Sequence, residues 1–112
     1  MKYLEYKGYS GSIEYSDEDQ LLFGKVLGVK GLLSYEGQTG KDLETDFKEV
    51  IDVYLADCEA ENKIPEKPFK GSFNVRIPST LHQKAALLAM EAKVSLNAFV
   101  AESIRSRVMK NV

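Results

Sequence analysis

The residues of this chain with the most specific chemistry are three polar side chains that alternate with apolar ones between Gly71 and Pro78. The polar residues are Ser72, Asn74 and Arg76, and the apolar residues are Phe73, Val75 and Ile77. This period-two alternation indicates a strand with one polar and one apolar face. A two-stranded β-ribbon fits the major groove of B-DNA, where Arg can donate twice to guanine and Asn can pair with adenine. The polar face therefore predicts base reading by Ser72, Asn74 and Arg76.

The predicted strand needs a partner, because both of its edges would otherwise remain unpaired. Pro78 ends the strand, and two apolar stripes at helical spacing follow it. The first stripe is Leu81, Ala85, Leu88 and Ala92, and the second is Leu96, Phe99, Val100, Ser103, Ile104 and Val108. One strand and two helices in about 40 residues cannot enclose a core alone. We therefore expect an intertwined dimer in which the strands of two copies pair antiparallel.

The core of this dimer is expected to combine the apolar face of the ribbon with the second helix. Its predicted members are Phe73, Val75, Ile77, Leu96, Phe99 and Val100. Ser95 is a suitable N-cap for the second helix. The free N–H groups at the start of that helix, with Ser95 and Asn97, can hold a DNA phosphate and fix the register of the ribbon.

The net charge of −2 conceals two halves of opposite charge. Residues 1–65 carry 7 Lys/Arg and 14 Asp/Glu, giving −7, whereas residues 66–112 carry 8 and 3, giving +5. The Pro- and Lys-rich stretch "NKIPEKPFKG" at the boundary is typical of a linker. We predict a domain at 1–65, a linker at 66–70 and a second domain at 71–112. The basic half suggests a polyanion such as nucleic acid, and the acidic half suggests a basic partner or solubility alone.

The acidic half has the pattern of a sheet covered by one helix. Alternation over residues 9–16 and two apolar runs at 21–29 and 32–37 predict a three-stranded antiparallel meander. From Thr39 the spacing becomes helical, and Thr39 and Asp42 have the spacing of a capping box. The apolar stripe of this helix is Leu43, Phe47, Ile51, Tyr54 and Cys58, and its acidic face is Asp46, Glu49, Asp52 and Glu59. The acidic face is most simply solvated, with docking of a basic protein as the alternative.

Other chemistries have weaker support in the sequence. A nuclease needs converging carboxylates, but three of the four candidates fall in one turn. These candidates are Glu14, Asp17, Glu18 and Asp19. The stretch "GQTGKD" lacks the spacing and the Ser or Thr of a phosphate-binding loop. His82 has no evident nucleophile or acid partner, and Cys58 fits a core position. With one Cys and one His, an ordinary zinc site is not expected, and we predict no catalytic site, metal or cofactor.

The composition is that of a soluble globular protein, with 44% hydrophobic and 29% charged residues. No apolar run approaches the length of a membrane span, and the stretch "MKYLEYKGY" lacks the apolar core of a signal peptide. We therefore expect a cytoplasmic location without a membrane partner.

The segment from Gly71 to about Val108 resembles a ribbon-helix-helix DNA-binding module. Together with "YSGSIEYSDEDQLLFGKVLGV" and "PFKGSFNVRIP", the entire chain resembles the HicB family of antitoxins. The resemblance implies an N-terminal domain with a truncated RNase H fold that binds a HicA ribonuclease toxin, and a C-terminal module that represses its own operon. Lys93 departs from such modules, which often have glycine between the two helices, so the turn there is expected to be strained or differently shaped.

The sequence thus predicts an α+β protein that is a non-enzymatic antitoxin and autorepressor. Its expected partners are a second copy of itself, with dimers or tetramers left open, a HicA-type toxin and double-stranded operator DNA. One alternative is a ribbon-helix-helix repressor whose N-terminal domain senses a small ligand. Another alternative is a metal-dependent nuclease.

Overall fold

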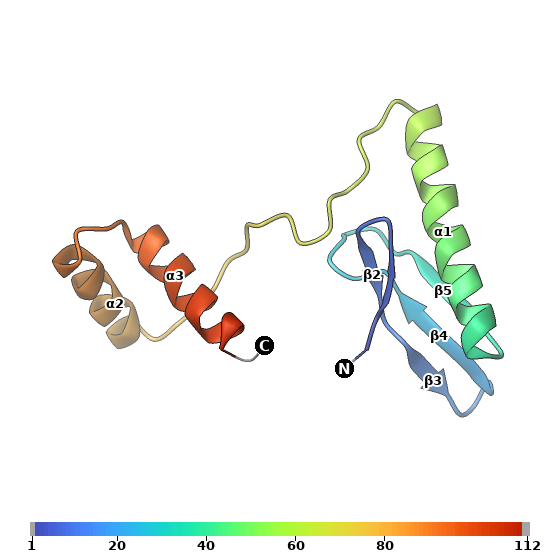
Figure 1. Cartoon of the computed structure of the whole chain (residues 1–112), viewed down its shortest axis with the longest axis horizontal. Helices are drawn as coiled ribbons and strands as arrows, with labels where there is room; N and C mark the ends of the chain where they lie inside the picture. The colour runs from blue at the N-terminus through green and yellow to red at the C-terminus, as the bar shows by residue number, and fades with distance from the viewer. Residues whose placement is uncertain (1, 111–112) are drawn as a thin grey trace. The chain divides into compact units, whose positions relative to one another are not determined.

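The computed structural model describes residues 2–110. The chain divides into two compact units, Met1–Ser72 and Phe73–Val112, here called the N-terminal and C-terminal units. The described residues form two small antiparallel sheets and three helices, which confirms the predicted α+β class (Figure 1). Among residues 2–110 there is no helix with the length and apolar character needed to cross a membrane.

The sheets of the N-terminal unit are built from five short strands. They are β1 (Leu4–Tyr6), β2 (Tyr9–Gly11), β3 (Glu14–Ser16), β4 (Leu21–Lys25) and β5 (Ser34–Gly37). β1 pairs antiparallel with β2, and the second sheet has the order β3-β4-β5. The predicted meander is therefore present, and β1 is an additional strand that the sequence pattern did not indicate.

The strand predicted over residues 9–16 is interrupted at Ser12, which is why it appears as β2 and β3. The Ser12 N–H donates to the Lys25 carbonyl at 3.0 Å, and the Ser12 hydroxyl accepts from the Lys25 N–H at 3.0 Å. On the N-terminal side of Ser12, a bridge between Gly11 and Val26 continues the pairing. β2 and β3 thus lie along one continuous partner segment, and Ser12 joins the two small sheets.

Helix α1 (Gly40–Ala60) covers this sheet and begins where the capping pattern predicted. The Thr39 hydroxyl accepts from the Asp42 N–H at 3.1 Å, which satisfies one of the free donors of the first turn. Four members of the predicted stripe are buried: Leu43, Phe47, Ile51 and Cys58. The apolar stripe is therefore the face that α1 turns toward the sheet.

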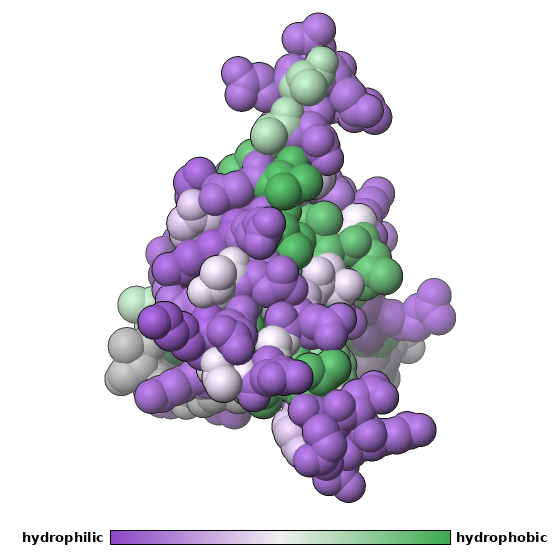
Figure 2. Space-filling model, turned by 90° about the vertical axis from the view of Figure 1, so that its right-hand side faces the viewer, coloured by the Kyte–Doolittle hydropathy of each residue, from purple (hydrophilic) through white to green (hydrophobic). Residues whose placement is uncertain are grey.

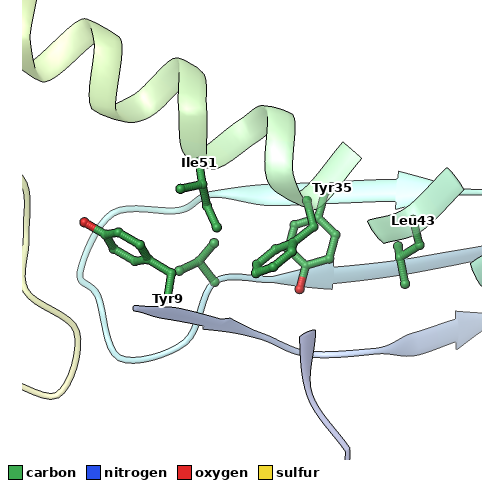
Figure 3. Close-up of a cluster of buried hydrophobic side chains, with 6 residues drawn as sticks. Tyr9, Tyr35, Leu43 and Ile51 are labelled. Atoms are coloured by element: carbon green, nitrogen blue, oxygen red, sulfur yellow. The ribbon is translucent and has the colours of Figure 1, made fainter. Parts of the chain in front are cut away.

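The core of the N-terminal unit lies between α1 and the strands (Figure 3). Its buried members are Tyr9, Val26, Tyr35, Leu43, Phe47 and Ile51. The Tyr35 and Phe47 rings meet edge to face with centroids 5.0 Å apart. Burial raises the pKa of Tyr35 to about 12, and its hydroxyl donates to the Ser12 carbonyl at 2.8 Å. Gly24 lies opposite Tyr35, and a Cβ there would be 2.7 Å from the Tyr35 hydroxyl oxygen, so only glycine fits.

The C-terminal unit contains the two predicted helices, α2 (Ser79–Glu91) and α3 (Leu96–Met109). Pro78 precedes α2 directly, and Ser95 caps α3 by accepting from the Ala98 N–H at 3.0 Å, as predicted. Among the described residues of this unit, only Ala89 is buried, at 2% exposure. The two helices therefore contact each other without enclosing a core within a single chain.

Lys93 joins these helices in the left-handed conformation, with φ of 59°. The Val94 N–H donates to the Ala89 carbonyl at 3.0 Å, and the Lys93 N–H donates to the Met90 carbonyl at 3.1 Å. This is the Schellman arrangement that usually places glycine at the left-handed position. Of the two turn shapes predicted at Lys93, strained or differently shaped, the structure has the strained one.

The Lys93→Gly substitution should stabilise the protein by about 0.5–1 kcal/mol, because it removes left-handed strain but increases unfolded-chain entropy. Urea unfolding of full-length variants measures this change. Lys84→Gly is the control, since Lys84 lies inside α2, where glycine should destabilise by about 1 kcal/mol. Equal destabilisation by both substitutions would show that the Lys93 turn carries no strain.

Candidate nucleic-acid interface

The predicted base-reading residues lie in an extended segment, residues 72–78, which we call the reading segment. This segment has no strand partner among the described residues of the single chain, and all of its residues are exposed. Phe73 is 72% exposed and Val75 is 65% exposed. Exposure of alternate large apolar side chains in an extended segment is typical of a surface that another chain covers.

An open apolar groove of about 390 Å³ lies between α2 and α3. It is lined by Ile77, Leu81, Ala85, Phe99, Val100, Ser103, Ile104, Arg107 and Val108. Three predicted dimer-core residues therefore line one groove, namely Ile77, Phe99 and Val100. The other three predicted members, Phe73, Val75 and Leu96, lie outside its lining.

The predicted phosphate contacts lie at the start of α3. The Ser95 hydroxyl is engaged as the helix cap, and Asn97 is exposed in the first turn. The first N–H groups of a helix have no intrahelical acceptor and carry partial positive charge, which favours an anion. His82 is exposed in the first turn of α2, and its main-chain N–H donates to the Pro78 carbonyl.

The acidic turn between β3 and β4 is held by its own hydrogen bonds. The Gln20 side chain donates to the Asp17 carbonyl at 2.7 Å, and the Asp19 N–H donates to the Ser16 hydroxyl at 3.2 Å. Within residues 2–110, no three His, Cys, Asp or Glu side chains gather as a metal site would require. Cys58 is buried as a free thiol, as predicted.

The acidic face of α1 is largely exposed, as its simplest interpretation from sequence predicted, but two of its carboxylates also bond to neighbouring elements. Asp52 accepts from Lys7 Nζ at 2.8 Å and from the Tyr6 hydroxyl at 3.0 Å, and the Lys7 bond holds the pKa of Asp52 below its ordinary value. Asp46 accepts from the Glu36 N–H at 2.8 Å. These carboxylates therefore tie the β1–β2 turn and β5 to the helix.

The same helix lines a second groove, of about 350 Å³, which we call the acidic groove. Its lining combines apolar and acidic side chains: Leu33, Asp46, Glu49, Val50, Val53, Tyr54 and Asp57. Val53 is 52% exposed. Hydrophobic surface is visible among hydrophilic side chains on the side of the molecule shown in Figure 2. Helical periodicity predicts that the other six lining residues lie on α1. No local sequence pattern predicts that Leu33, from a loop distant in sequence, lines the same groove.

Residues 66–69 are fastened to the N-terminal unit, and we call this segment the strap. The Glu66 carboxylate accepts from the Lys30 N–H at 2.8 Å and the Gly31 N–H at 3.1 Å, which lowers the pKa of Glu66. The Phe69 N–H donates to the Gly28 carbonyl at 3.1 Å. The strap includes four of the five residues predicted as a linker, 66–70, and these contacts join segments more than 30 residues apart.

Comparison with known proteins gives one family match. No curated protein and no solved structure matches the chain. Residues 54–104 match the sequence model of the HicB family, a range that runs from the last turns of α1 through the strap and the reading segment into α3. The matched range thus includes most of the predicted interface as well as the segment that connects the two units. This match covers slightly less than half of the chain, and over that range the chain is similar to the HicB family.

Proposed function

We propose that this protein is a non-enzymatic antitoxin that neutralises a HicA-type ribonuclease and represses its own operon. The similarity of residues 54–104 to the HicB family supports the toxin-antitoxin role. DNA binding is supported above all by the reading segment, which is extended, exposed and unpaired beside an open apolar groove. Pairing of two such segments produces the ribbon that a major groove accepts.

In this proposal the apolar face of the ribbon packs onto the helices of the dimer. Ile77 already lines the groove between α2 and α3, so Val75 and Phe73 follow on the same face of the strand. The polar face, with Asn74 and Arg76, is then directed away from the core and toward the bases. Ser95 and Asn97 at the start of α3 contact a phosphate and set the orientation of the ribbon.

The toxin is assigned to the N-terminal unit, and within it to the acidic groove. Residues 1–65 carry a net charge of −7, and three carboxylates line the groove beside the exposed side chain of Val53. A ribonuclease binds a polyanion and therefore has a basic surface, which an acidic apolar groove complements in charge. Occupation of that surface by the antitoxin excludes RNA.

The Val53→Lys substitution should weaken binding of the toxin at least tenfold, about 1.4 kcal/mol, because it adds a like charge at the centre of the proposed contact. The probe is a purified HicA-type toxin, and calorimetric titration measures its affinity. Ala56→Lys is the matched control, since Ala56 is exposed on the same helix outside the groove lining. Equal affinity of the two variants would place the toxin elsewhere on the protein.

The whole proposal is tested by reconstitution. Full-length protein should suppress the ribonuclease activity of a HicA-type toxin, and it should bind DNA from its own promoter in preference to random DNA. A protein that leaves the ribonuclease active is not its antitoxin. Failure to distinguish promoter from random DNA would instead contradict the repressor role alone.

A further inference from the structure

The strap lies against Tyr54, one of the residues that line the acidic groove. Tyr54 lines the groove, and its hydroxyl accepts from the Glu66 N–H at 2.8 Å. The Tyr9 hydroxyl donates to the Glu66 carbonyl at 2.9 Å, and the Tyr9 and Tyr54 rings meet edge to face at 6.4 Å. The main chain of Glu66 is therefore held by two tyrosines that belong to the core side of the N-terminal unit.

The side chain of Glu66 fixes the loop that leads into the other wall of the groove. Its two carboxylate oxygens accept from the adjacent N–H groups of Lys30 and Gly31. Leu33, two residues further on, lines the groove, and its carbonyl accepts from the Val26 N–H at 2.9 Å. Glu66 thus connects both walls, Tyr54 on the helix and the loop that ends at Leu33.

Phe69 closes the far end of the strap on the same loop. Its N–H donates to the Gly28 carbonyl, and Gly28 has φ of 76°. A Cβ at Gly28 would be 2.8 Å from the Phe69 ring, so the ring packs directly on the glycine. None of residues 66–69 lines the acidic groove, so the strap and an occupant of the groove do not compete for space.

We infer that closure of the strap and occupation of the acidic groove stabilise each other, so that toxin binding controls the free length of the linker to the reading segment. The inference rests on the proposed function, because it takes the toxin as the occupant. An occupant that packs on Tyr54 and Leu33 holds the two elements to which the strap is bonded. By linkage, closure of the strap must then raise the affinity for the occupant by the same factor by which the occupant favours closure.

The consequence for the linker follows from chain geometry. With the strap closed, only Lys70 and Gly71 lie between Phe69 and the reading segment. With the strap open, the free chain begins near the end of α1 and has several times that length, at roughly 3.5 Å per residue. The toxin-bound protein therefore keeps its N-terminal unit on a shorter tether to DNA than the free protein does.

Hydrogen exchange of the full-length protein tests strap closure itself. The N–H groups of Lys30, Gly31, Glu66 and Phe69 should be protected in the wild type. Glu66→Ala should expose all four, including Phe69, whose acceptor on Gly28 the substitution does not remove. Lys67→Ala is the control, because Lys67 is exposed within the strap and should leave the exchange unchanged. Retained protection at Phe69 in Glu66→Ala would show that the strap does not open as a unit.

Titration with a purified HicA-type toxin tests the linkage. Glu66→Ala should weaken its binding at least about fivefold, the lower end of typical coupling, while Lys67→Ala should not. Glu66→Gln keeps the side-chain volume and one acceptor, so its affinity for the toxin should lie between those of Glu66→Ala and Lys67→Ala. Binding should also slow exchange of the N–H groups of Lys30, Gly31, Glu66 and Phe69 in the wild type. Equal affinity of wild type and Glu66→Ala overturns this inference alone, whereas no binding to the wild type overturns the proposed function as well.

Discussion

A Phe99→Asp variant should sediment as a monomer with the 12.5 kDa mass of one chain, whereas the wild type should sediment as a dimer or a larger assembly. Phe99 lines the apolar groove between α2 and α3, which the reading segment of a second chain is proposed to cover. Burial of an unpaired carboxylate costs several kilocalories per mole, and a symmetric dimer has two. Dimer affinity should therefore fall at least about a thousandfold, which corresponds to ~4 kcal/mol.

The same variant should lose DNA binding, because an unpaired reading segment cannot form a ribbon. Phe73→Asp should have the same two effects, although Phe73 lies outside the groove lining. Ala101→Asp is the matched control, since Ala101 is exposed on α3 and also lies outside that lining. A wild-type protein that sediments as a folded monomer would contradict the proposed dimer, as would a Phe99→Asp variant that remains dimeric.

The second large effect is expected at Arg76. Two-fold symmetry places two Arg76 side chains and two Asn74 side chains on a pseudo-palindromic operator. A bidentate base contact contributes about 1–3 kcal/mol of discrimination, so Arg76→Ala should reduce specific affinity by about 2–6 kcal/mol per dimer. Binding to random DNA should fall far less. Fluorescence titrations against operator and random DNA at fixed salt measure both affinities.

Ser95→Ala provides the contrast for this experiment. The Ser95 hydroxyl caps α3, and the proposed DNA contact there is to a phosphate. Its removal should therefore weaken binding to operator and to random DNA by about the same factor. If Arg76→Ala keeps the full preference for the operator, the reading face is wrongly assigned and the strand register is shifted by one residue.

The helices and their starting points could be predicted from the sequence because their signals are local. Thr39 and Ser95 form the predicted caps, and the stripe from Leu43 to Cys58 is buried as the period of 3.6 requires. The bounds and number of the strands were harder to predict from local signals. β1 has three residues, too few for a periodic pattern, and the break at Ser12 depends on its bonds to Lys25.

The C-terminal unit shows where an apolar pattern and burial within one chain diverge. Leu81 and Leu88 belong to the predicted stripe of α2, yet both are more than half exposed, whereas Ala89 is buried. A stripe predicts which residues are available for a core, but it does not say which chain completes that core. The extended conformation of the reading segment was predicted, and its pairing stays a prediction.

The strap and the acidic groove could not be predicted from the sequence. Both depend on contacts between distant segments, such as Glu66 with Lys30 and Leu33 with the middle of α1. The Pro and Lys composition around Glu66 is typical of a linker, and composition does not reveal that a single carboxylate is bound by two main-chain N–H groups. Charge predicted an acidic half, but the hollow that concentrates three of its carboxylates is a property of the fold.

The pairing of the reading segment is tested most directly by nuclear magnetic resonance of a full-length dimer mixed from isotopically labelled and unlabelled chains. The proposed antiparallel ribbon predicts intermolecular contacts between residues 72–78 of one chain and the same residues of the other, with protected N–H groups at alternate positions. If the labelled sample shows contacts of residues 72–78 only within their own chain and rapid exchange of their N–H groups, the ribbon does not form. The assignment of DNA reading to this segment would then be contradicted.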